Sequence, residues 1–168
     1  TFNNVRGANV TIVVTGPGTA FFNTANSTLT LRGTTSATNI TATSSTGTLD
    51  NFDIVTGSNG SVGDVTLNGN LTGDSDLIID GTAGNITYGR MDGDGTIAIG
   101  ADATSLTFGS FAGGFVQGRG VQTVRINGNY GNDNPGIQGE ARLSFLSAGT
   151  ITVTGASRGT LSVDRDIQ

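Results

Sequence analysis

A short motif, two apolar side chains separated by one residue, recurs along this chain and constrains its fold more than any other feature. Between Leu77 and Phe108 it occurs at Leu77/Ile79, Ile86/Tyr88, Ile97/Ile99 and Leu106/Phe108. Successive copies are alternately nine and eleven residues apart, so every second copy recurs after twenty residues. Each copy is followed within two residues by a glycine. A fixed period near twenty residues is typical of solenoid proteins, and one turn of a parallel β-helix fits this length.

Composition decides between order and disorder. Of the 168 residues, 28 are Gly, and only 12% are charged. Such a chain is a candidate for disorder, but disordered chains usually combine high net charge with low hydrophobicity, whereas the apolar residues here are periodic. Thr, Val and Ile favour strands, and Gly, Asn and Asp favour turns. We therefore expect one ordered all-β domain over residues 1–168, without the 3.6-residue apolar period of helices.

The first third of the chain follows the pattern less regularly. A strand near 10–14 is expected to end at Gly16-Pro17-Gly18, because Pro lacks the N–H that a strand needs. One series of strands then continues through Val10/Ile12, Leu29/Leu31 and Leu49, at steps of nineteen and twenty residues. Residues 49–65 break the period and predict an irregular corner.

Two series of strands are expected to continue beyond Phe108. The first comprises Val124/Ile126, Leu143/Phe145 and Leu161/Val163, and the second comprises Val116, Ile137 and Ile151/Val153. Together the series predict a right-handed parallel β-helix, a β-solenoid of about eight coils of ~20 residues. A β-sandwich is the alternative, because Asn-Gly and Asp-Gly pairs, such as those at 59–60, 68–69, 80–81 and 127–128, are strong hairpin signals. The near-constant period favours the solenoid.

Three segments resemble a known class of repeat. Residues 60–74, 84–100 and 148–167 are similar to the Gly-rich parallel β-helix repeats of large bacterial surface and secreted proteins, such as autotransporter passengers and filamentous adhesins. The resemblance implies an extracellular, Lys-poor, Thr- and Asn-rich scaffold. It implies no shared catalytic residue.

Missing residue types and charge exclude several functions. The sequence contains no Cys and no His, so it has no thiolate metal site and lacks the commonest general base. A net charge of −5 argues against nucleic-acid binding, which needs a basic face. No apolar run approaches the ~20 residues needed to span a bilayer, so we expect no membrane insertion.

Paired aspartates are the candidate metal ligands. Asp74/Asp76 and Asp92/Asp94 place carboxylates two residues apart among Gly and Ser, and turns of this kind can direct carboxylate oxygens to a calcium ion. A twenty-residue turn brings Asp74 or Asp76 near Asp94. The alternative is that these residues only form turns, since Asp bonds its own backbone amides there.

Catalysis and partner binding have less support in the sequence. Glycoside hydrolysis needs two carboxylates, and the available groups are Asp50, Asp53, Arg90, Arg119 and Arg125, with Glu140 as the sole glutamate. No pair among them stands out, so we predict that the chain is not an enzyme. Segments 110–122 and 129–141 carry a candidate binding surface, made of Phe111, Phe115, Tyr130, Arg119 and Arg142. The favoured alternative places Phe111 and Phe115 in the core.

These observations predict a non-catalytic structural or adhesive segment of a secreted or cell-surface bacterial protein, with a carbohydrate or surface ligand as a candidate partner. The alternative is a carbohydrate-binding or carbohydrate-cleaving module. A parallel solenoid leaves unpaired backbone groups at each end. We therefore expect this chain to be a fragment of a larger protein or to associate end to end.

Overall fold

The structure, a computed structural model, describes residues 10–131 and 141–163. These residues form twelve β-strands and no helix, so the all-β prediction is confirmed. The strands are β1 (Val10–Thr15), β2 (Thr19–Asn23), β3 (Thr28–Arg32), β4 (Asn39–Asp50), β5 (Asp53–Thr56), β6 (Val65–Thr72), β7 (Leu77–Ile79), β8 (Ala83–Met91), β9 (Thr96–Phe111), β10 (Phe115–Ile126), β11 (Arg142–Val153) and β12 (Thr160–Val163).

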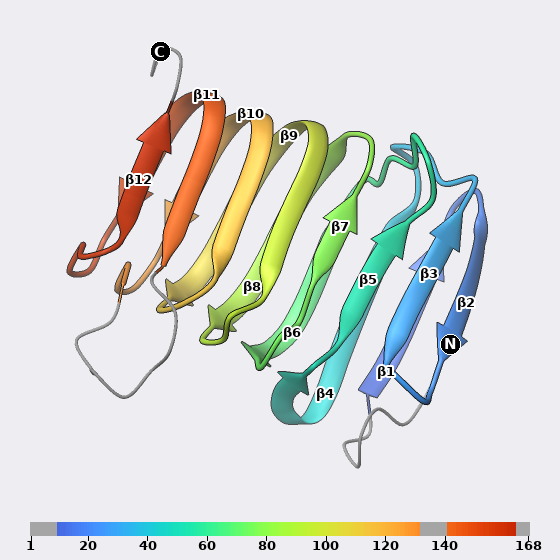
Figure 1. Ribbon diagram of the computed structural model, residues 1–168. Coiled ribbons are helices and arrows are strands. Elements are labelled where there is room, and N and C mark those ends of the chain that lie inside the picture. Colours follow the sequence, from blue (N-terminus) through green and yellow to red (C-terminus); the bar gives the residue numbers. More distant parts are fainter. Residues whose placement is uncertain (1–9, 132–140, 164–168) are drawn as a thin grey trace.

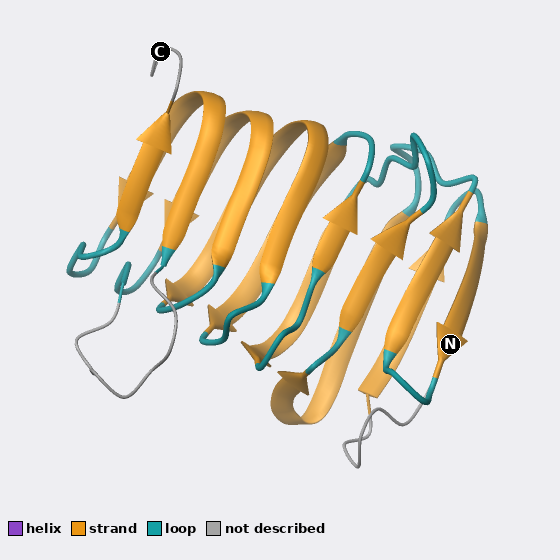
Figure 2. Ribbon diagram, in the orientation of Figure 1, coloured by secondary structure: helices purple, strands orange, loops and turns teal. Residues whose placement is uncertain are grey.

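All twelve strands belong to one mixed sheet that bends until it is nearly barrel-shaped. Figure 1 shows it as two layers, which we call layer A and layer B. Layer A, nearer the viewer, contains β2, β3, β5, β7, the first halves of β9, β10 and β11, and β12. Layer B contains β1, β4, β6, β8 and the second halves of the three long strands. These long strands curve continuously from one layer into the other (Figure 2).

The middle of the chain has the predicted register. In layer A, Leu77 pairs with Ile97 in parallel, and in layer B, Ile86 pairs with Leu106. Both steps are twenty residues, because each circuit passes once through each layer. The side chains of all four residues are buried, so apolar residues of successive circuits stack on one another between the layers.

The N-terminal register differs from the prediction. β1 pairs with β4 and β2 pairs with β3 in the antiparallel direction, so Val10 lies opposite Ser44 and not in series with Leu29. Leu29 pairs instead with Ile54, twenty-five residues later, and Leu49 pairs with Leu71. The series Val10, Leu29, Leu49 is therefore wrong.

Two local features explain the N-terminal difference. The chain reverses its direction within layer A at the turn of 24–27, which joins β2 and β3 as an antiparallel hairpin and in which Ser27 adopts a φ of 57°. The register between β4 and β6 also shifts between Thr43 and Thr48, which lengthens the circuit. The predicted irregular corner lies within 49–65, at the turns of 57–64 between β5 and β6.

The two series predicted after Phe108 exchange places beyond β10. Val116 pairs with Leu143 and Val124 with Ile151, each step being twenty-seven residues. Leu143/Phe145 therefore continues layer A, whereas the prediction joined it to Val124/Ile126. The cause is the long connection 127–141, which delays the next circuit. Ile137 lies outside the described residues.

Stacked aromatic rings fill one end of the core. The centroids of Tyr88 and Phe108 lie 5.6 Å apart, those of Phe108 and Phe111 5.1 Å, and those of Phe111 and Tyr130 5.7 Å. Phe111 is buried, as predicted. The inward prediction for Phe115 is wrong, because this ring lies on the outer face of layer A, 5.9 Å from the Arg142 guanidinium carbon. Alternation along β10 turns Val116 inward and Phe115 outward.

Leu106→Asp and Thr107→Asp test the assignment of inward and outward faces. Leu106 is fully buried in β9, and its neighbour Thr107 points outward beside Arg125 of β10. A buried unpaired carboxylate should cost roughly 4 kcal/mol or more, whereas the carboxylate at 107 should cost under about 1 kcal/mol. Urea unfolding followed by circular dichroism measures both, and equal losses would contradict the assignment.

The two buried tyrosines are expected to respond differently to loss of the hydroxyl. The Tyr88 hydroxyl has no hydrogen-bond partner among the described residues, whereas the Tyr130 hydroxyl donates to the Thr160 carbonyl. Tyr88→Phe should therefore stabilise the fold by about 1 kcal/mol, and Tyr130→Phe should destabilise it by a similar amount. Comparing the two variants in urea unfolding at pH 7 controls for the shared loss of a hydroxyl.

The same residues predict a loss of stability in alkali. Burial raises the pKa of Tyr88 well above its usual 10.0 and raises that of Tyr130 to about 12. The unfolded chain therefore ionises first, so their contribution is intact below pH 10 and falls as the pH rises toward 12. Tyr88→Phe should flatten this fall in unfolding free energy measured from pH 8 to 12; an unchanged slope would contradict it.

Candidate functional site

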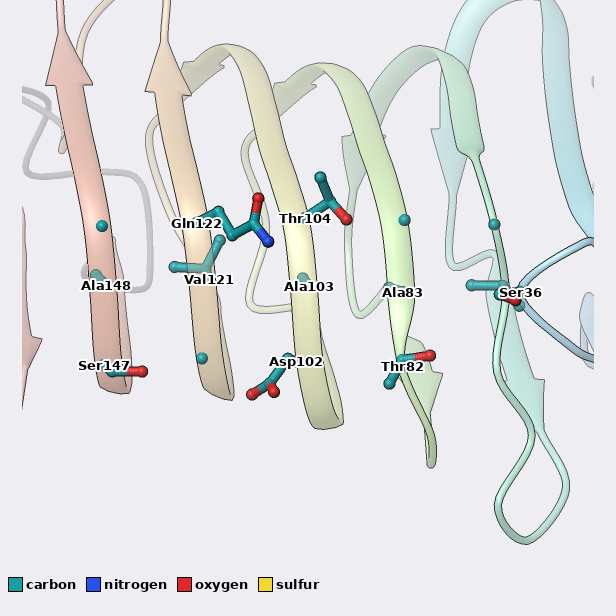
Figure 3. A pocket seen from close by; sticks show the side chains of 15 residues that line it. Ser36, Thr82, Ala83, Asp102, Ala103, Thr104, Val121, Gln122, Ser147 and Ala148 are labelled. Atoms are coloured by element: carbon teal, nitrogen blue, oxygen red, sulfur yellow. The ribbon is translucent and has the colours of Figure 1, made fainter.

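A groove crosses successive circuits where the chain bends from layer A to layer B (Figure 3). Its floor is a column of small apolar residues, Val62, Ala83, Ala103, Val121 and Ala148. These residues are neighbours through the parallel pairs of β8 to β11 and the bridge from Val62 to Ala83. All five are buried. Because their side chains are short, a hollow of about 570 Å³ remains above them.

Polar side chains form the two walls of this groove. Thr82, Asp102 and Ser147 stand on one side of the floor, and Thr104 and Gln122 on the other (Figure 3). On the first side, Gly120 separates Asp102 from Ser147. A Cβ at this glycine would lie 2.7 Å from Asp102 Oδ1 and 3.0 Å from Ser147 Oγ. The two side chains therefore approach each other over a glycine.

The groove offers hydrogen bonds and little catalytic chemistry. Of its lining residues, which all lie in the described part of the chain, Asp102 carries the only carboxylate. The other side-chain polar groups are hydroxyls and the Gln122 amide. Acid–base hydrolysis of a glycoside uses two carboxylates facing each other across the bond, and this wall provides one. The arrangement suits an uncharged polar chain lying along the groove.

Sequence reasoning missed this groove. Its floor residues are Ala or Val, and these side chains carry no functional group that a sequence motif could reveal. The available signal was positional, since one small apolar residue lies between two apolar motifs in each circuit, as Ala103 does between Ile99 and Leu106. Such a residue marks where the chain passes from one layer to the other.

The structure brings together two of the four candidate calcium ligands. Residues 73–75 lie against 93–95, because a Cβ at Gly93 would be 2.0 Å from the Gly73 carbonyl oxygen and one at Gly95 2.1 Å from that of Ser75. Asp74 and Asp94 are therefore neighbours on successive circuits, and both are exposed. The prediction that Asp74 or Asp76 falls near Asp94 is confirmed.

The other two candidates already have partners. Asp76 Oδ1 accepts a hydrogen bond from the Thr96 amide at 2.8 Å, and Asp92 forms an ion pair with Arg90. Within residues 10–131 and 141–163, no group of three or more Asp, Glu, His or Cys is placed to hold a metal ion. Calcium binding at Asp74, Asp76, Asp92 and Asp94 stays a prediction.

The carboxylates considered for catalysis connect neighbouring circuits. Asp50 accepts a hydrogen bond from the Thr72 hydroxyl at 2.9 Å, and Asp53 accepts one from the Asp76 amide at 3.1 Å. Arg90 is paired with Asp92, and Arg125 Nε donates to Asn127 Oδ1. Glu140 lies outside the described residues. The two aspartate contacts tie neighbouring circuits together, whereas the two arginine contacts join residues two apart in the sequence. The four contacts do not converge on a common point.

The predicted binding surface divides between the core and the outside. Phe111 and Tyr130 are buried in the aromatic stack. Phe115, Arg119 and Arg142 lie on β10 and β11, at positions that alternate with inward side chains, so they share the outer face of layer A.

Comparison with known proteins gives no match to a family model, a curated protein or a solved structure. The described residues contain no helix long and apolar enough to cross a membrane.

The calcium hypothesis predicts a metal-dependent melting temperature. If calcium bridges Asp74 and Asp94, millimolar calcium should raise the melting temperature by mass action. The Asp74→Asn/Asp94→Asn variant should lose that rise, and should melt higher than the parent without metal because two adjacent like charges are removed. Magnesium at equal ionic strength is the control. Equal curves with and without calcium in the parent chain would contradict the hypothesis.

Proposed function

We propose that this chain is a right-handed parallel β-helix serving as a non-catalytic structural or adhesive segment of a secreted or cell-surface bacterial protein. The observation that carries the proposal is a ladder of short polar side chains, hydrogen-bonded from each circuit to the next. Such a ladder uses the surface side chains to hold the circuits together.

The strand pairing supports the helical path. Layer A contains a series of parallel pairs through β3, β5, β7, β9, β10, β11 and β12. In Figure 1 the chain from β3 onward runs upward in layer A and downward in layer B while it advances toward the C-terminal strands. This course corresponds to a right-handed coil, the hand expected for parallel crossovers.

The ladder contributes one polar side chain from each of four successive circuits. Asn39 Oδ1 accepts a hydrogen bond from the Asp64 amide at 2.8 Å, and Asp64 Oδ1 accepts one from Asn85 Nδ2 at 2.9 Å. Asn85 Oδ1 in turn accepts one from Ser105 Oγ at 2.8 Å. Each link contributes about 0.5–1.5 kcal/mol, and consecutive links restrain each of these four circuits against its neighbours. A stiff spacer benefits from such restraint along its axis.

The groove of small residues favours a second candidate function, a carbohydrate-binding or carbohydrate-cleaving module. Its length across several circuits and its hydroxyl and amide walls suit a polar chain. Two features make this the weaker proposal. None of the lining residues is aromatic, and Asp102 is the only acid among them. The groove therefore supports weak binding better than cleavage.

Cell-surface labelling tests the proposed function. Antibodies raised against the folded chain should label intact cells of the source organism, because a surface segment is accessible without lysis. A cytoplasmic enzyme detected in parallel controls for leakage. Labelling that appears only after lysis would contradict a surface role.

A glycan array distinguishes the second candidate. The scaffold proposal predicts no binding above background by the parent chain or by its Asp102→Asn/Gln122→Ala variant. Binding by the parent that the variant loses would support a carbohydrate module in its place.

A further inference from the structure

The outer face of layer A carries opposite charges on the two sides of β9. Asp80, directly after β7, lies next to Gly100 of β9, since a Cβ at Gly100 would be 2.2 Å from the Asp80 carbonyl oxygen. Arg119 of β10 lines the same hollow as Asp80 and Gly100. The three residues form one row across three neighbouring strands, with the acid and the arginine on opposite sides of a glycine.

A second row, nearer the beginning of the same strands, repeats this arrangement. It comprises Asp53 of β5, Asp76 before β7, Thr96 of β9, Phe115 of β10 and Arg142 of β11. The acids again precede β9 and the arginine follows it. Arg32, on β3, lies three strands from β9, at the edge of this pattern.

These charges are not neutralised by ion pairs within the chain. Among residues 10–131 and 141–163, the one ion pair joins Arg90 to Asp92 in layer B. Asp80 and Arg119 are both exposed, and Asp80 Oδ2 accepts a hydrogen bond from the Asn59 amide at 2.6 Å. Asp80 and Arg119 can therefore meet an opposite charge from outside.

We propose that two copies of the chain pack the outer faces of layer A together, related by a two-fold axis that runs parallel to β9. This rotation exchanges the strands before β9 with those after it. Asp80 of each copy then faces Arg119 of the other, and Asp53 faces Arg142. One surface supplies both members of every pair, as an isologous interface requires.

The shape of the face fits the same arrangement. A hollow of about 370 Å³ lies over Ala98, Gly100 and Gly118, between walls that include Asp80 and Leu146. The small residues of β9 meet each other at the axis and allow close approach. Sheets packed face to face lie about 10 Å apart, a gap that an extended arginine and an aspartate together can span.

Leu146 provides an apolar contact in this dimer. It is 45% exposed, which is unusual for a large apolar side chain in this chain. It lies on β11, two strands after β9, and the rotation places it over the position two strands before β9. That position is Gly57, directly after β5, which leaves room for the leucine.

The size of the face sets the expected strength. Seven strands at ~4.8 Å and about five residues at ~3.3 Å give roughly 550 Å² per copy. The total of about 1,100 Å² lies at the lower limit for specific interfaces. We therefore expect a weak dimer, with a dissociation constant in the micromolar range, that weakens as salt screens the charges.

Sedimentation equilibrium of the full chain tests the dimer, with charge reversal as the probe. Arg119→Asp places two acids opposite each other and should weaken dimerisation at least about tenfold. Adding Asp80→Arg to that variant restores opposite charges and should recover affinity to within about threefold. The matched control is Arg125→Asp, the same substitution on the outer face of layer B, which should leave the dissociation constant unchanged. Circular dichroism confirms that each variant is folded.

Several results would overturn the proposal. A chain that stays monomeric up to millimolar concentration has no such interface. An open series of oligomers beyond the dimer would indicate end-to-end association, because a two-fold interface closes at two copies. A dimer that Arg119→Asp leaves unchanged, or that the double reversal does not restore, uses another surface.

Discussion

The structure depends on the stacking of inward apolar side chains between consecutive circuits. Leu77, Ile97, Val116 and Leu143 follow one another in layer A, paired through parallel strands and buried. Each buried side chain of this size contributes about 1.5–3 kcal/mol. Slipping one strand by a single residue would turn its apolar set outward. The core therefore fixes the register, and the register fixes every position on the surface.

Glycine at the corners makes this stacking geometrically feasible. A Cβ at Gly109 would lie 2.1 Å from the carbonyl oxygen of Gly89, the corresponding residue of the preceding circuit. Any side chain there would force the circuits apart and break the hydrogen bonds on both sides. The polar ladder follows from the same closeness, since Asn85 can reach Asp64 and Ser105 only when the circuits are in contact.

The sequence was sufficient to predict the all-β class and the register of the circuits between Leu77 and Phe108, because there the period is constant. It was insufficient at the two places where a circuit gains residues or reverses. No periodic signal shows that the turn of 24–27 folds β2 back on β3, so that β1 and β2 run against the direction of the strands beside them. The long connection 127–141 likewise places Leu143 in layer A, beside Val116, and not in layer B beside Val124 as the period predicted. The adjacency of Asp74 and Asp94 was predictable because it depends on the period alone. The groove depends on the volume that short side chains leave unfilled in the folded chain, which the period does not show.

Because the circuits are stacked at a fixed spacing, the position of a residue in the sequence determines its position on one face of the molecule. Residues one circuit apart lie about 4.8 Å apart on neighbouring strands, so the order of charges along the chain becomes their order along the axis. In layer B the charged and polar groups bond to one another, as Arg90 does with Asp92 and Asn85 with Asp64. In layer A, Asp80 and Arg119 lie on opposite sides of β9 with a glycine between them, and no ion pair joins them among the described residues. A stiff scaffold can therefore keep opposite charges apart on one face, where a flexible chain would pair them, and this separation leaves them available to a second molecule.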